Sequence, residues 1–145
     1  MRTKEEYMKD LSKMKKNIYF DGEIIDRLDE RQMPCINTIG TTFDVVEDPE
    51  YADLILAKSH LSGEIINRFT HIHQNTDDLH KKQDMTRKIC QKVGGCIQRC
   101  MGCDGTNAVY NVSYEADKSN NGTTNYHDNF KKWLARFQKE DLIAA

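Results

Sequence analysis

The sequence has little of several features that mark particular classes of protein. It has only two prolines in 145 residues, Pro34 and Pro49, and it contains no internal repeat and no low-complexity stretch. No apolar run approaches the roughly 18 residues that a membrane helix needs. The charged N-terminus, residues 1–11, lacks the apolar core of a signal peptide. We therefore expect a cytoplasmic protein without a membrane segment.

An excess of charge of one sign is also missing. The chain has 21 basic and 23 acidic residues, for a formal net charge of −2. This balance argues against a generally basic nucleic-acid-binding protein and against an acidic tail protein. The length is that of one domain, which can bury about two thirds of the surface of its unfolded chain. We expect residues 1–145 to form a single domain.

Most of the chain has the periodicity of amphipathic helices, so the sequence predicts an all-α domain with at most one minor β-hairpin. Thr3 and Glu6 form a capping box before the first helix, and Pro34 can open the second. The stretch around Asp21-Gly22 fits either a short hairpin or a loop that leads into a helix. The expected helices cover, in order, about residues 3–14, 34–46, 50–59, 62–69, 76–101, 108–117 and 126–139.

The longest expected helix begins with Thr76 and the pair Asp77-Asp78. These residues supply a cap and early negative charge, which favour a helix start. An acid/base site at the aspartate pair is the less favoured interpretation. The stretch 105–107 is expected to interrupt the helical pattern before the next helix.

The cysteines are the most informative residues. Five is an odd number, and a chain without a secretory signal favours reduced thiols or metal ligands over disulfides. Cys96, Cys100 and Cys103 are spaced i, i+4 and i+7, so on one helix they lie within about 60° of one another. Thiolates on one helix face can bind a soft metal centre. The alternative is three buried cysteines that pack as small apolar residues, and we favour that structural role for Cys35 and Cys90.

Neighbouring residues support a site on this face. Arg99 is expected on its flank, where a guanidinium would lower the pKa values of the thiols and offset an anionic cluster. Gly94 and Gly95 are expected inside the helix, where two glycines cost roughly 2 kcal/mol. They suggest that backbone or a bulky group approaches closely there.

The three cysteines do not complete a site by themselves. Zinc and a 4Fe–4S cluster each take four ligands. The missing ligands could be His71, His73, His80 or another cysteine, or they could lie outside this chain. The spacing also matches that of radical S-adenosylmethionine enzymes, but their motif needs a loop of a βα barrel, and this chain is too short for one.

Several segments carry a resemblance to a known family. They are NRFTHIHQNTDDLHKK at 67–82, DPEYADL at 48–54, CIQRCMGCD at 96–104 with 107–108, and residues 124–127 and 141–143. From end to end, the chain resembles the N-terminal domain of the 4-hydroxybutyryl-CoA dehydratases. These belong with the HpaB-like flavin-dependent 4-hydroxyphenylacetate 3-monooxygenases, of acyl-CoA dehydrogenase-like fold. The Cys-x-Gln-Arg-Cys pattern is the specific part, because it separates the dehydratases from the hydroxylases.

The resemblance implies a set of cofactors. The dehydratases hold a 4Fe–4S cluster with three cysteines and one histidine, and they use FAD. Cys96 and Cys100 match two of the cysteine ligands, whereas Cys103 is implied to be an extra buried thiol. Arg99 is implied to tune the cluster, and Gln98 is expected to pack the helix end. The other two ligands come from a later part of the family chain.

The resemblance also implies what the whole protein does. The family has a helical N-terminal domain, a central β domain and a C-terminal helical bundle, so this chain is expected to be an N-terminal fragment that is inactive alone. The intact enzyme would convert 4-hydroxybutyryl-CoA to crotonyl-CoA through transient one-electron oxidation by the flavin. It would also have vinylacetyl-CoA Δ-isomerase activity and form a homotetramer. Two alternatives remain open: a stand-alone helical zinc-binding or interaction module, and a fragment of an HpaB-type hydroxylase.

Overall fold

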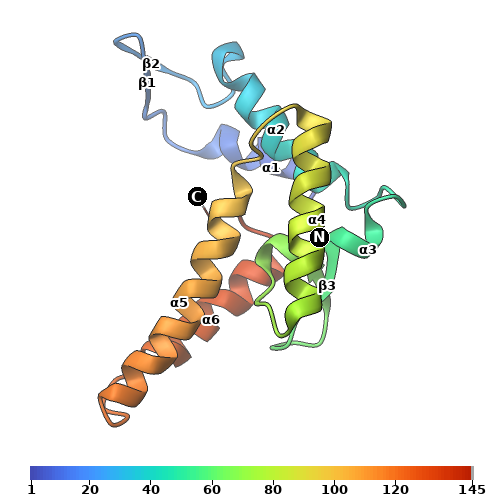
Figure 1. Ribbon diagram of the computed structural model, residues 1–145. Helices are drawn as coiled ribbons and strands as arrows, with labels where there is room; N and C mark the ends of the chain where they lie inside the picture. Colours follow the sequence, from blue (N-terminus) through green and yellow to red (C-terminus); the bar gives the residue numbers. More distant parts are fainter. Residues whose placement is uncertain (145) are drawn as a thin grey trace.

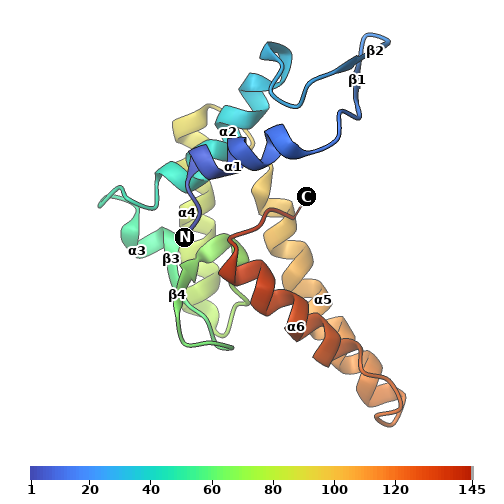
Figure 2. The ribbon, with the colours of Figure 1, turned by 180° about the vertical axis from the view of Figure 1, so that it is seen from behind.

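Three long helices frame the molecule in the computed structural model, which describes residues 1–144 (Figure 1). Helix α4 (Thr76–Val93) leads through a short turn into α5 (Arg99–Ser119). Helix α6 (Tyr126–Lys139) returns beside α5 after the Asn- and Gly-rich turn at 119–125. Figure 1 and Figure 2 both show α5 and α6 as an antiparallel pair that extends away from α1 and α2. The C-terminal segment comes back across the start of α5.

The N-terminal part forms as the sequence predicts. Helix α1 (Lys4–Lys13) begins at Thr3, whose side chain accepts from the Glu6 N–H in a complete capping box. Strands β1 (Ile18–Phe20) and β2 (Glu23–Ile25) pair in antiparallel register. This confirms the hairpin interpretation. The turn between the strands has positive φ at both Asp21 and Gly22, as a two-residue type I′ turn requires.

Helix α2 confirms the predicted role of Pro34. The 3₁₀ turn η1 (Glu30–Gln32) leads into α2 (Met33–Asp44), which carries Pro34 in its first turn. A proline is tolerated there because the first N–H groups of a helix have no partner within the helix. Helix α2 packs on α1, and this places Tyr7 on Phe43 with ring centroids 5.5 Å apart.

The region after α2 is not two helices, and the prediction of helices at 50–59 and 62–69 is wrong. It contains the one-turn helix α3 (Ala52–Ile55), the antiparallel strands β3 (Leu56–Lys58) and β4 (Ile65–Asn67), and the 3₁₀ turn η2 (Arg68–Thr70). Ala57 pairs with Ile66 and both are buried. Short apolar runs fit a strand as well as a helix, and here strand pairing prevails.

The long helix predicted to reach Met101 ends earlier. Gly94 is its C-cap, with φ of 73°, and it donates its N–H to Cys90 O. The two glycines therefore terminate α4 instead of lying inside it. The predicted interruption at 105–107 is also wrong, because α5 is continuous from Arg99 to Ser119.

Replacing Gly94 with Ala should lower the free energy of unfolding by about 1–2 kcal/mol, because a Cβ is disfavoured in the left-handed conformation. The matched control is Gly95→Ala. An added Cβ at Gly95 meets nothing within 4 Å and φ is not positive there. Urea denaturation of both variants tests the prediction, and equal stability of the two would contradict it.

None of the helices in residues 1–144 combines the length and the apolar character that a membrane span requires.

The core runs between the helices as three apolar clusters. The largest cluster fills the space between α4, η2 and the start of α5, and it includes Phe69, Met85, Ile89, Ile97 and Cys103. The start of α5, where Cys100 and Cys103 lie, is therefore anchored in the largest of the three apolar clusters.

Candidate metal centre

The turn between α4 and α5 presents the first cysteine. Ile97 is fully buried, while its neighbour Cys96 is exposed. Gln98 adopts a left-handed conformation with φ of 61°, and its N–H donates to Cys96 Sγ at 3.4 Å. The turn thus fixes Cys96 at the surface through its buried neighbour, with an amide N–H that donates to its sulfur.

Cys100 lies in the first turn of α5, beside Cys96. Burial raises the pKa of its thiol, and so does the nearby thiol of Cys96, while the N–H groups of Met101 and Cys100 lower it. The first N–H groups of a helix carry partial positive charge, which favours anions at that point. Two free thiols side by side at this end of a 21-residue helix can together bind a soft metal centre.

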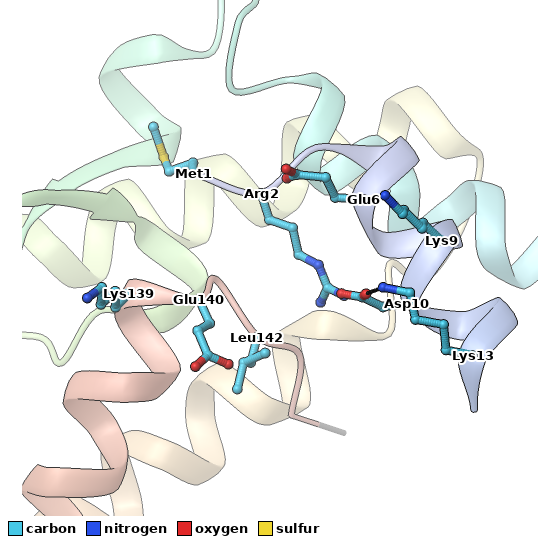
Figure 3. Close-up of a pocket in the computed structure, with 9 residues that line it drawn as sticks. All are labelled: Met1, Arg2, Glu6, Lys9, Asp10, Lys13, Lys139, Glu140 and Leu142. Atoms are coloured by element: carbon cyan, nitrogen blue, oxygen red, sulfur yellow. Dashed lines mark hydrogen bonds and ion pairs between the residues drawn. The ribbon is translucent and has the colours of Figure 1, made fainter. Parts of the chain in front are cut away.

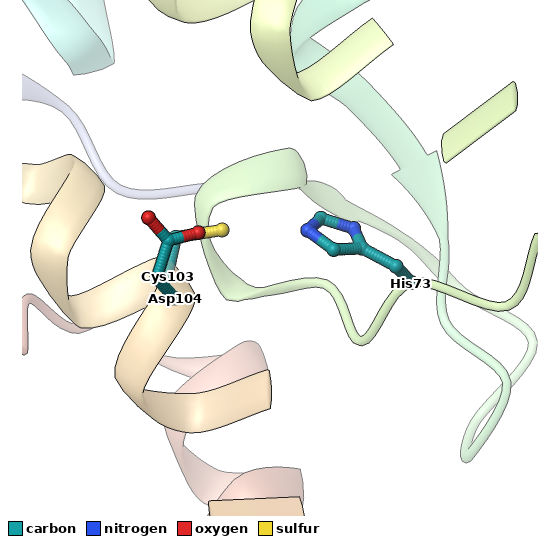
Figure 4. A group of neighbouring side chains, drawn as sticks. All are labelled: His73, Cys103 and Asp104. Carbon is teal, nitrogen blue, oxygen red and sulfur yellow. The ribbon is translucent and has the colours of Figure 1, made fainter. Parts of the chain in front are cut away.

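The three cysteines do not share one helix face, and that prediction is wrong. Cys96 precedes α5, so the angular relation of a continuous helix does not apply to it. Cys103 is buried on α5, and burial raises the pKa of its thiol to about 11. Its Sγ lies near His73 and Asp104 (Figure 4). The structure thus pairs Cys96 with Cys100 and places Cys103 in another setting.

Arg99 does not lie on an exposed flank of the thiols. Its side chain is fully buried and pairs with Asp141, and it also donates to Thr42 Oγ1 at 3.1 Å. The guanidinium lies between Phe43 and Phe69, with its carbon 4.7 Å and 5.2 Å from the ring centroids. Although Arg99 lowers the pKa of Cys103, burial outweighs it. The expected effect of Arg99 is thus present at Cys103, but the pKa of that thiol is raised on balance.

The histidines of the 71–80 segment lie in three different environments. His71 is buried and its Nε2 lies 3.1 Å from Asp78 Oδ2. His80 is exposed on α4. His73 is half-buried, and neither of its ring nitrogens has a hydrogen-bond partner among residues 1–144. Of the three, His73 alone belongs to the group of potential metal ligands identified in the described chain.

Asp78 organises the start of α4, while the cap itself is Asn75, whose side chain accepts from the Asp78 N–H at 2.9 Å. The Asp78 carboxylate accepts from Arg68 Nη1 at 3.0 Å and from the Gln74 N–H at 2.9 Å. Burial alone would raise the pKa of Asp78, but the Gln74 N–H, His71 and Arg68 together lower it to about 2. The helix-start interpretation holds, and the carboxylate also ties α4 to η2.

The lowered pKa of Asp78 predicts an acid-labile contribution to stability. A carboxylate whose pKa is lower in the folded state stabilises the fold above its unfolded pKa, about 4, and this contribution is lost as the pH falls toward 2. Asp78→Asn should flatten the decline of unfolding free energy between about pH 5 and pH 2. Asp77→Asn, at an exposed position, should keep the wild-type slope. Equal slopes in all three proteins would contradict the assignment.

A charged groove lies between α1 and the end of α6 (Figure 3). Its walls carry both signs of charge, and Arg2 pairs with Asp10 at 2.6 Å across it. None of the five cysteines lines the groove. The groove is open and its charges are of mixed sign, so it offers no convergent set of groups for chemistry.

The fold is shared with 29% of the chain of a solved oxygenase. The oxygenase component (HpaB) of 4-hydroxyphenylacetate 3-monooxygenase superimposes with a TM-score of 0.71 over 99% of this chain, at 18% identity. Residues 3–145 match the family described as "4-hydroxyphenylacetate 3-hydroxylase N terminal". The chain belongs to this family.

Two relatives are more similar in sequence, and both are dehydratases. The 4-hydroxybutyryl-CoA dehydratase/vinylacetyl-CoA-Δ-isomerase of Clostridium aminobutyricum is 43% identical over 145 residues, which is 99% of this chain. An oxygen-tolerant archaeal 4-hydroxybutyryl-CoA dehydratase from N. maritimus gives a TM-score of 0.90 at 31% identity over 98% of this chain. The chain spans 29% and 28% of the lengths of these two relatives.

Proposed function

We propose that this chain is the N-terminal part of a 4Fe–4S- and FAD-dependent dehydratase that converts 4-hydroxybutyryl-CoA to crotonyl-CoA and water. We also propose vinylacetyl-CoA Δ-isomerase activity for the whole protein. The observation that carries the proposal is the pair of neighbouring free thiols, Cys96 and Cys100, at the start of α5. The 43% identity to a relative named for both activities supports it over the whole of this chain.

The thiol pair fits two of the four ligands of a cluster. Cys96 is exposed and Cys100 half-buried, so a cluster would sit at the surface of this domain, where further ligands from another domain can reach it. Its anionic charge would meet the N-terminal end of α5, and the Gln98 N–H already points at the Cys96 sulfur. Such amide hydrogen bonds are one means by which proteins tune iron–sulfur centres.

The cofactors and this chain would contribute to the reaction in different ways. When bound, the flavin supplies reversible one-electron chemistry, and the iron–sulfur group supplies Lewis-acid help to the departing hydroxyl. The contribution of this chain is positional. Ile97 anchors the turn in the core, so Cys96 and Cys100 are held at fixed places against the rest of the enzyme.

The remaining parts of the proposal follow the family. We propose that the other two cluster ligands, most of the flavin pocket and the CoA site lie in a central β domain and a C-terminal helical bundle of acyl-CoA dehydrogenase-like architecture. The natural partners of this domain would then be those domains and neighbouring subunits of a homotetramer. On these grounds the 145-residue chain by itself would be inactive.

Iron and acid-labile sulfide content of the full-length protein, purified without oxygen, tests the cofactor assignment. The proposal predicts about four iron and four sulfide per chain, and predicts that Cys96→Ser with Cys100→Ser removes both. Iron content that is unchanged in the double variant would overturn the ligand assignment. One zinc per chain with no iron, the zinc being lost in the double variant, would favour the zinc module instead.

A further inference from the structure

We propose a second metal site in this chain, formed by His73, Cys103 and Asp104, that binds a single divalent transition-metal ion such as zinc. The proposal goes beyond the cluster site, because it uses neither Cys96 nor Cys100. It also differs from the zinc module considered for the sequence, which relied on those two thiols.

The geometry assembles three different donor atoms at one point. A ring nitrogen of His73, Cys103 Sγ and an Asp104 carboxylate oxygen all lie within 4.8 Å of one another. Figure 4 shows the Cys103 sulfur and the His73 ring pointing toward each other, from α5 and from the segment that precedes α4. Small side-chain rotations would bring such atoms to the ligand distances of about 2.0–2.3 Å that zinc requires.

The His73 ring is the independent observation that points to a ligand. Both of its ring nitrogens are buried from solvent, and neither has a hydrogen-bond partner in the described part of the chain. A buried polar atom without a partner is costly, and native proteins seldom leave one.

Asn107 holds the two segments in register. Its Oδ1 accepts from the His73 backbone N–H at 2.8 Å. Its Nδ2 donates to His71 O at 3.0 Å and to Cys103 O at 2.9 Å. One side chain thus fixes the backbone at His73 and at Cys103, although these residues are far apart in sequence. Such support around ligands is what gives a metal site defined geometry.

The chemistry of the donor set favours a borderline metal. Nitrogen, sulfur and oxygen ligands together suit zinc, and a thiolate with a carboxylate balances the two charges of the ion. On binding, the Cys103 thiol gives its proton to solvent and the sulfur bonds to the metal. Three protein ligands leave the fourth tetrahedral position for water.

Lys82 would compete with a metal ion for the Asp104 carboxylate, and this competition supplies a test of the site. Its Nζ lies 2.6 Å from Asp104 Oδ1, so a metal must displace this ion pair. Lys82→Gln frees the carboxylate and removes a nearby positive charge, so it should tighten metal binding several-fold. The matched control is Lys81→Gln, since Lys81 instead contacts Asp53 and Asp77.

The experiment uses the full-length protein with Cys96→Ser and Cys100→Ser, titrated with Co²⁺ alone. We expect one Co²⁺ per chain with a sulfur-to-cobalt charge-transfer band. Cys103→Ser should remove the band, and His73→Phe should weaken binding by at least about tenfold. His80→Phe, at an exposed position of α4, should leave binding unchanged. Since Asp104 is exposed, Asp104→Asn supplies a second test if Cys103→Ser does not fold.

Three results would overturn the proposal. They are the absence of a charge-transfer band, a band that survives Cys103→Ser, and equal affinities of His73→Phe and His80→Phe. Because the thiol pair is absent from this background, none of these results bears on the proposed cluster. Conversely, a full-length protein without iron would refute the cluster and leave this site standing.

Discussion

Replacing Cys100 with Ser in the full-length protein should lower turnover of 4-hydroxybutyryl-CoA by at least about 100-fold, because loss of a ligand exceeds the 10- to 100-fold effects of residues around a metal site. Cys100 lies at the first turn of α5 beside Cys96. A serine hydroxyl is a poor substitute for a thiolate toward iron. The cluster and the activity should therefore be lost together.

The control for this prediction is Cys35→Ser. Cys35 is exposed on α2, so the buried packing role predicted for it is wrong. Its substitution removes one thiol without touching the start of α5. Iron content and initial rates of crotonyl-CoA formation should match those of the wild type in the control. A Cys100→Ser protein that keeps its iron and its rate would exclude Cys100 as a ligand.

The second large effect concerns stability. Removing one member of the buried Arg99–Asp141 pair should cost about 3–5 kcal/mol, because the other charge is left buried without a partner. Arg99 and Asp141 are only 2% and 1% exposed, and burial lowers the pKa of Arg99 despite the opposing effect of Asp141. The pair joins the first residue of α5 to the C-terminal segment, which also accepts from Arg99 at Leu142 O, 3.2 Å away.

Urea denaturation of Asp141→Asn and Arg99→Met tests this prediction. The matched control is Arg136→Gln, which breaks an exposed pair with Glu140 and should change stability by less than about 1 kcal/mol. Equal losses in the control and in the two buried variants would contradict the account. Because Arg99 directly precedes Cys100, the buried variants should also retain less iron in the full-length protein.

Local signals predicted the local parts of this fold. The capping box of Thr3 and Glu6, the turn at Asp21-Gly22 and the placement of Pro34 each depend on residues a few positions apart. The pair Gly94-Gly95 does mark a feature of a helix, but it is the end of α4 and not the predicted close approach inside a helix. A glycine at a helix C-cap and a glycine within a helix look alike in sequence, and only the positive φ of Gly94 distinguishes them.

The parts that the sequence could not predict depend on distant contacts. Strands β3 and β4 form because Ala57 meets Ile66, and no period within either short run requires that pairing. Arg99 was expected on the flank of the cysteine face, but it is buried with Asp141, a partner 42 residues away in sequence. The approach of His73 to Cys103 depends on the path of the chain between η2 and α4.

The candidate site was likewise predictable only in part. The resemblance singled out Cys96 and Cys100, and the structure places them side by side at a helix N-terminus. Asn107 belongs to one of the matching segments, and the sequence alone assigns it no role. Its three hydrogen bonds to the 71–73 segment and to Cys103 supply a structural reason for an asparagine there.

The most direct test of the account is to assay the full-length protein and the 145-residue chain, without oxygen, on 4-hydroxybutyryl-CoA. The account predicts that the full-length protein forms crotonyl-CoA and also isomerises vinylacetyl-CoA, while the 145-residue chain does neither. Turnover by the 145-residue chain alone would contradict the proposal that the site is completed by other domains. A full-length protein that hydroxylates 4-hydroxyphenylacetate with reduced flavin and leaves 4-hydroxybutyryl-CoA unchanged would contradict the dehydratase assignment itself.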